Sequence, residues 1–150
     1  MLERGDTSVV LIGTPAERAT SETVRRHMRH APIVVTGETS VELMVAILSC
    51  AHLVISNDTG AAHVAPAVGT PVLVLFGPTE DFATRPFSDL ALVIRKPVAC
   101  APCMRRECPI DHRCMTDITV EDVVRPAFRL LDEGRWAHAF VASSDAGERW

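Results

Sequence analysis

Tyrosine is absent from the 150-residue sequence, and aromatic residues together make up only 5% of it. A surface of stacked aromatic rings for single-stranded nucleic acid therefore has little to be built from. The formal net charge of -4 offers no general attraction for a polyanion either. We therefore expect no nucleic-acid partner.

Long apolar runs are also missing. No stretch approaches the roughly twenty apolar residues that a membrane span requires, and the N-terminal residues are too polar for a signal peptide. We therefore expect no transmembrane segment and a cytoplasmic location. In that reducing compartment the five cysteines are not expected to form a disulfide framework, so their spacing needs another explanation.

Several familiar catalytic and nucleotide-binding motifs do not occur. The sequence contains no Gly-x-Gly-x-x-Gly and no Walker motif, which disfavours ordinary dinucleotide dehydrogenases and P-loop enzymes. Ser40 and Ser56 lack the context of a nucleophile elbow, so acyl transfer by a serine triad has little support. We assign no catalytic residue within this chain.

What the sequence does contain is an alternation of apolar runs with helical patterns. Such an alternation predicts an α/β fold, with a Rossmann-like open parallel sheet and helices on both faces. We expect this domain to cover residues 1–134, with a cysteine-rich loop at 100–114, and residues 135–150 to form a poorly ordered tail. The predicted strands are 8–13, 33–37, 53–56, 72–76 and 90–95, and the predicted helices are 15–30, 40–51, 61–68 and 119–132.

The turn at 56–60 joins a predicted strand to a predicted helix, at the sheet edge where ligands bind in such folds. Gly60 allows a close approach of the backbone, Thr59 offers its hydroxyl and amide to a phosphate oxygen, and His63 lies one turn further on. The carboxylate of Asp58 repels phosphate but can accept hydroxyls from a sugar. The alternative is that Asp58 only caps the helix and His63 lies in the core. Because three other loops with Gly or Thr share this edge, we favour a ligand site.

Glu17 is a second candidate carboxylate at the same edge. It lies in the first turn of a predicted helix, directly after Gly13 and Thr14. A carboxylate at that place can bind a ribose diol. Complementing the helix dipole explains it equally well.

Four cysteines form a cluster within fifteen residues. Cys100, Cys103, Cys108 and Cys114 follow the spacing C-x2-C, C-x4-C and C-x5-C. Four thiolates can close a tetrahedral structural zinc site, with His112 as a substitute ligand. A reduced cluster that packs without metal explains the spacing as well, and both interpretations stay open. Taken alone, this segment would favour a non-enzymatic zinc-loop interaction module.

The stretch Val-Ile-Ser-Asn-Asp-Thr-Gly-Ala-Ala-His-Val-Ala-Pro-Ala-Val-Gly-Thr-Pro, at 54–71, leads into Val-Leu-Val-Leu-Phe-Gly-Pro-Thr. It closely resembles the C-terminal half of glycosyltransferase family 9, the ADP-heptose:lipopolysaccharide heptosyltransferases. The resemblance continues through Cys-Ala-Pro-Cys and Cys-Pro-Ile-Asp-His-Arg-Cys, and it covers about residues 8–132. It implies a GT-B architecture of two Rossmann-like domains, and an inverting transfer from ADP-heptose that needs no metal for its chemistry.

The resemblance also implies roles for individual residues. Asp58, Thr59 and Gly60 would contact the diphosphate and sugar of the donor, and His63 would lie beside them. Glu17 and Thr39 would lie near the adenosine. The implied partners are an ADP-sugar donor and a lipid A core-type acceptor, with peripheral contact to the inner membrane.

Members of this family are more than twice as long as this sequence. We therefore expect that the first βα unit of the donor domain is missing, together with the N-terminal half that holds the acceptor and the catalytic carboxylate. Such a truncated chain would bind donor but be inactive by itself. The alternative from another enzyme class is a nucleotide-sugar epimerase of the GT-B kind, which product analysis without an acceptor would distinguish.

Overall fold

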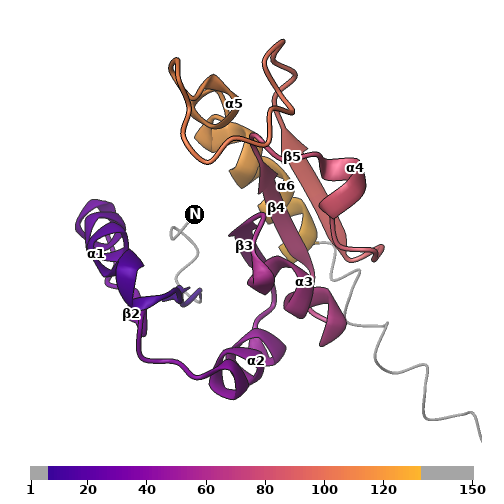
Figure 1. The fold of residues 1–150 in the computed structure, drawn as a ribbon. Coiled ribbons are helices and arrows are strands. Elements are labelled where there is room, and N and C mark those ends of the chain that lie inside the picture. The colour runs from indigo at the N-terminus through magenta and orange to yellow at the C-terminus, as the bar shows by residue number, and fades with distance from the viewer. Residues whose placement is uncertain (1–6, 133–150) are drawn as a thin grey trace, which may run out of the picture. The chain divides into compact units, whose positions relative to one another are not determined.

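The computed structural model describes residues 7–132, and the chain divides into two compact units, Met1–Ile47 and Leu48–Trp150. Figure 1 shows their helices and strands along the chain. The tail predicted at 135–150 lies outside the described residues, so it stays a prediction.

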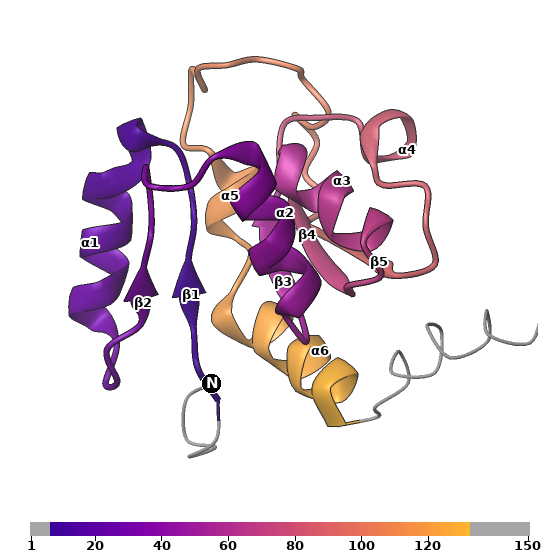
Figure 2. The same cartoon turned by 90° about the horizontal axis from the view of Figure 1, so that it is seen from below.

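The first unit is built around two short parallel strands, β1 (Val10–Leu11) and β2 (Ile33–Val34). A 3-10 turn, η1 (Pro15–Glu17), leads into α1 (Arg18–His27), which runs alongside β2 in both views (Figure 1, Figure 2). The helical segment begins at Pro15 as predicted. It ends three residues early because Met28 adopts an extended conformation, with φ -89° and ψ 138°.

The contact between α1 and the end of β2 is partly polar. The hydroxyls of Ser21 and Thr36 lie 2.7 Å apart in a hydrogen bond, and both residues are buried. A tight turn follows, in which Gly37 has a φ of +75° and its N–H donates to the carbonyl of Gly13 at 2.8 Å. The next helix, α2 (Val41–Cys50), carries the boundary between the two units.

The second unit contains three parallel strands in the order β3 (Val54–Asn57), β4 (Val72–Phe76) and β5 (Ala91–Arg95). In register, Val72 of β4 lies opposite Val54 on one side and Ala91 on the other. Helix α3 (Gly60–Ala67) covers one face of this sheet, and α6 (Val120–Asp132) covers the opposite face (Figure 1, Figure 2). Buried on both faces and paired on both edges, β4 forms the core.

The α/β class with parallel strands is confirmed, but the strands form two separate sheets rather than one. Two short helices were not predicted, α4 (Asp81–Thr84) and α5 (Arg113–Thr116). Over residues 7–132, no helix is long and apolar enough to cross a membrane.

Candidate functional site

The turn between β3 and α3 has the form that the sequence predicts, except for the identity of its cap. Thr59, with φ -140° and ψ 172°, is the N-cap of α3, and its side chain makes no capping hydrogen bond. Its hydroxyl instead lies 3.1 Å from that of Ser56, which donates to the carbonyl of Asn57 at 2.8 Å. The alternative in which Asp58 only caps the helix is therefore wrong.

Asp58 and His63 face each other across this turn. Nε2 of His63 lies 4.0 Å from Oδ1 of Asp58, close enough for an ion pair when the imidazole is protonated. The other oxygen of Asp58, Oδ2, accepts a hydrogen bond from the hydroxyl of Thr84 at 3.2 Å. The His63 side chain is 49% exposed, so it is not a core histidine, whereas that of Asp58 is only 17% exposed. The two side chains thus meet where solvent, or a ligand, can reach them.

Gly60 leaves the first turn of α3 open. A Cβ atom built on this glycine would meet no other heavy atom within 4 Å. The amide of Ala62 in this turn donates to the carbonyl of Thr59 at 3.0 Å. The first N–H groups of a helix otherwise have no partner within the helix, and together with the helix dipole they attract anions. The turn therefore combines an accessible anion-binding backbone with a carboxylate and an imidazole.

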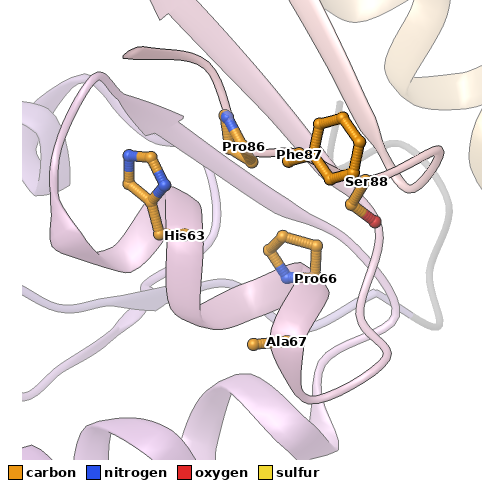
Figure 3. A pocket seen from close by; sticks show the side chains of 6 residues that line it. All are labelled: His63, Pro66, Ala67, Pro86, Phe87 and Ser88. Atoms are coloured by element: carbon orange, nitrogen blue, oxygen red, sulfur yellow. The ribbon is translucent and has the colours of Figure 1, made fainter.

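A shallow pocket of about 190 Å³ adjoins His63. Figure 3 shows His63, Pro66 and Ala67 on α3, and the segment 86–88 across from them. The ring of Phe87 in that segment is fully exposed. The imidazole therefore borders both the Asp58 turn and a partly apolar hollow on the same unit.

Thr84 is the residue of this site that sequence reasoning missed. It is the last residue of α4, a four-residue helix whose sequence is too short to show a period. The only signal for it was its position after Gly77, Pro78 and Thr79, in the loop that follows the carboxyl end of β4. This loop is one of the loops with Gly or Thr that the sequence predicts at the ligand edge. The prediction does not extend beyond Thr79.

Glu17 and Thr39 belong to the first unit. Oε2 of Glu17 accepts hydrogen bonds from the amide and the hydroxyl of Thr14, both at 2.7 Å. These bonds, the one from the backbone first, lower the pKa of Glu17. Glu17 therefore accepts the amide that begins the 3-10 turn, and Thr39 is half-buried, in the segment between the Gly37 turn and α2. Their contact with adenosine stays a prediction.

The profile of glycosyltransferase family 9 (heptosyltransferase) matches residues 1–113 of this sequence. The chain belongs to glycosyltransferase family 9. Among curated relatives, lipooligosaccharide heptosyltransferase 2 of Campylobacter jejuni is 31% identical over 97 residues, which cover 63% of this chain and 30% of that protein. This family 9 chain thus spans less than a third of the length of that relative.

Two solved structures share the fold of the chain. The glycosyl transferase family 9 protein from Veillonella parvula superposes with a TM-score of 0.74 at 27% identity, over 87% of this chain and 38% of that one. The ADP-heptose lps heptosyltransferase II of E. coli superposes with a TM-score of 0.72 at 25% identity, over 85% and 37%. The predicted family and fold class are therefore confirmed.

The cysteine-rich loop of this family 9 chain is anchored beside β4. The amides of Cys103 and Met104 both donate to the carbonyl of Pro78, at 3.0 and 2.8 Å. Cys108 Sγ accepts the amide of His112 at 3.2 Å. Burial first, and then the charges of the neighbouring cysteines, raise the pKa of the Cys114 thiol.

The thiols of Cys100, Cys103 and Cys108 thus lie within electrostatic range of the Cys114 thiol. Among residues 7–132, no group of three or more His, Cys, Asp or Glu side chains is placed to hold a metal ion. Cys100 and Cys103 are exposed, whereas Cys114 on α5 is buried. The structural zinc assigned to Cys100, Cys103, Cys108 and Cys114 stays a prediction.

Proposed function

We propose that this chain is the donor-binding part of an inverting glycosyltransferase that takes ADP-heptose and acts in lipopolysaccharide core biosynthesis. The observation that carries the proposal is the Asp58–His63 pair beside the open first turn of α3. Oδ1 of Asp58 and Nε2 of His63 lie 4.0 Å apart, next to a glycine with no atom within 4 Å of its missing Cβ. The family to which the chain belongs supports the same assignment.

Each part of a nucleotide diphosphate sugar has a complementary group at this turn. The amides at the start of α3 suit a diphosphate, and a protonated His63 adds positive charge beside it. The carboxylate of Asp58 is an acceptor, so it suits the hydroxyls of the sugar rather than the phosphates. Charge that develops on the departing diphosphate would be stabilised by the same donors.

In our proposal, the chain supplies the donor site but not the other groups that the reaction needs. An inverting transfer needs a general base beside the acceptor hydroxyl, and we assign that base and the lipid A core-type acceptor to the rest of the enzyme. The isolated chain would accordingly bind donor without transferring sugar. A cytoplasmic location, with peripheral contact to the inner membrane through the acceptor, belongs to the same proposal.

Donor binding to the purified full chain tests the proposal directly. ADP-heptose should raise the Tm of the unaltered chain, because a ligand that binds only the folded state stabilises it by mass action. Asp58→Ala should abolish most of this increase. Gly60→Ala should do so as well, because the added methyl group fills the space in front of α3, while leaving the Tm of the ligand-free chain unchanged.

The matched control is Asp89→Ala, which removes an exposed carboxylate from the same unit. Its Tm increase with ADP-heptose should equal that of the unaltered chain. Equal protection of the Asp58→Ala and Asp89→Ala variants would refute the assignment of the donor site. Sugar transfer to a lipid A core acceptor by the isolated chain would show that the base lies within it.

A further inference from the structure

The carboxylate of Asp58 is held from outside its own turn. Thr84, twenty-six residues later, donates its hydroxyl to Oδ2 of Asp58 at 3.2 Å. Oδ1, the other oxygen, is the one that lies 4.0 Å from Nε2 of His63. The two oxygens of the carboxylate therefore have different neighbours: Oδ2 accepts from Thr84, and Oδ1 faces the imidazole of His63.

The hydroxyl of Thr84 has one proton and two acceptors within reach. Besides Asp58, it lies 3.0 Å from the carbonyl oxygen of Glu80, the N-cap of α4. A hydroxyl donates a single hydrogen bond, and a bond to an ionised carboxylate is the stronger of the two. The hydroxyl hydrogen therefore either points to Asp58 or is shared between Asp58 and the carbonyl of Glu80.

Helix α4 is in turn attached to the sheet at its other end. Arg95, the last residue of β5, forms an ion pair with Asp81 in the first turn of α4. Oε1 of Glu80 accepts the amide of Phe82 at 3.4 Å and so caps the same turn. The position of Thr84 is therefore determined by β5 and not only by its loop.

We propose that Thr84 is a positioning residue for the donor site, which holds the Asp58 carboxylate in the orientation that binds the sugar. The inference rests on the proposed function. A carboxylate has lone pairs for about four hydrogen bonds, so the bond from Thr84 leaves Oδ1 and part of Oδ2 for sugar hydroxyls. Without that bond Asp58 can rotate away, and part of the binding free energy is spent on ordering it again.

The test compares Thr84→Val with Thr84→Ser. Valine keeps the shape but removes the hydroxyl, and we expect the affinity for ADP-heptose to fall about tenfold, the effect of losing one hydrogen bond to a charged group. The affinity for ADP, which lacks the sugar, should stay within about twofold. Thr84→Ser should restore the affinity for ADP-heptose. A general loss of structure would instead weaken both ligands equally and lower the Tm.

The matched control is Thr23→Val. The hydroxyl of Thr23 also donates to the carbonyl four residues earlier, that of Ala19, at 2.9 Å, and Thr23 belongs to the first unit, whereas Asp58 and Thr84 belong to the second. This variant should bind both ligands as the unaltered chain does. Unchanged affinity of Thr84→Val for ADP-heptose, or an equal loss for ADP-heptose and ADP, would overturn the positioning role.

A second measurement does not depend on the donor. The carbon-13 NMR signal of the Asp58 carboxyl should move in Thr84→Val and return in Thr84→Ser, because the hydrogen bond polarises that group. An unmoved signal would overturn the inference whatever the binding data are. Failure of the unaltered chain to bind either ligand would instead overturn the proposed function, and the NMR signal would still report whether Thr84 holds Asp58.

Discussion

The two parallel sheets of this chain start from the same sequence pattern and end with very different interiors. Apolar runs that end in glycine form β2 and β4 alike, at 33–37 and 72–77. In β4, Val72, Leu73 and Val74 are 0% exposed, whereas Ile33 of β2 is 56% exposed. The burial of a strand therefore depends on its neighbours, because β4 is paired on both edges and covered on both faces.

The Asp58 turn lies on the better packed of the two sheets. Asp58 follows β3, and Thr84 belongs to the loop that follows β4, so both are held by the best-packed part of the chain. A site that must keep its groups within a fraction of an ångström gains from such support. In the first unit, the carboxylate of Glu17 accepts hydrogen bonds from Thr14, three residues away in the sequence.

The largest expected effect tests the difference between the two sheets. Leu73→Ala should lower the free energy of unfolding by about 2–5 kcal/mol, because it leaves a cavity in a fully buried strand. Ile33→Ala removes a similar volume from an exposed position and should cost less than about 1 kcal/mol. Urea unfolding followed by circular dichroism measures both. Similar losses for the two variants would mean that β2 is as buried as β4.

The second-largest expected effect is the difference in stability between glycine substitutions in two turns that follow strands. At Gly37 the φ is +75°, and an added Cβ would lie 2.8 Å from the Cα of Pro15. Gly37→Ala should therefore cost roughly 1–3 kcal/mol through backbone strain. Gly60→Ala, placed in open space, should change the stability by less than about 0.5 kcal/mol. The same urea experiment distinguishes them, and a Gly60→Ala loss as large as that of Gly37→Ala would show that the start of α3 is not open.

The contrast between the units also indicates what could be predicted from the sequence. The bounds of β4 were predicted to the residue, because Pro71 and Gly77 delimit a purely apolar run. In the first unit, β1 extends over Val10–Leu11 only, although the uninterrupted apolar run covers 9–12. An apolar run predicts that a strand exists, whereas its length depends on the partner strand that completes its ladder.

Only part of the candidate site could be predicted from the sequence, because one of its contacts depends on neighbouring strands. Asp58, Thr59, Gly60 and His63 are close in the sequence, so the strand–turn–helix pattern alone places them together. Thr84 reaches Asp58 only because β3 and β4 are adjacent in the sheet and α4 follows β4. A contact of this kind depends on tertiary structure, and no local pattern within α4 indicates it.

The smallest expected effect compares one carboxylate from each unit. Asp122 on α6 accepts a hydrogen bond from Lys96, which follows β5, at 2.7 Å between Nζ and Oδ2, and it also caps its helix through Thr119. Glu22 binds Arg25 and Arg26, both within α1. Because Asp122 joins two elements and Glu22 only one, Asp122→Asn should lower the Tm at neutral pH by more than Glu22→Gln does.

Acid should narrow the difference in Tm between each variant and the unaltered chain. The hydrogen bond from Lys96, followed by those from Thr119, holds the pKa of Asp122 well below its usual value, and Arg25 and then Arg26 lower the pKa of Glu22 to about 2. A lowered pKa in the folded state adds stability above the pKa of the unfolded chain, and this stability is lost as the pH falls through the folded value. The Tm gap between each variant and the unaltered chain should therefore narrow from below about pH 4.5 towards pH 2. A gap for Asp122→Asn that does not narrow between about pH 4.5 and pH 2 would mean that lost packing, rather than lost charge, causes it.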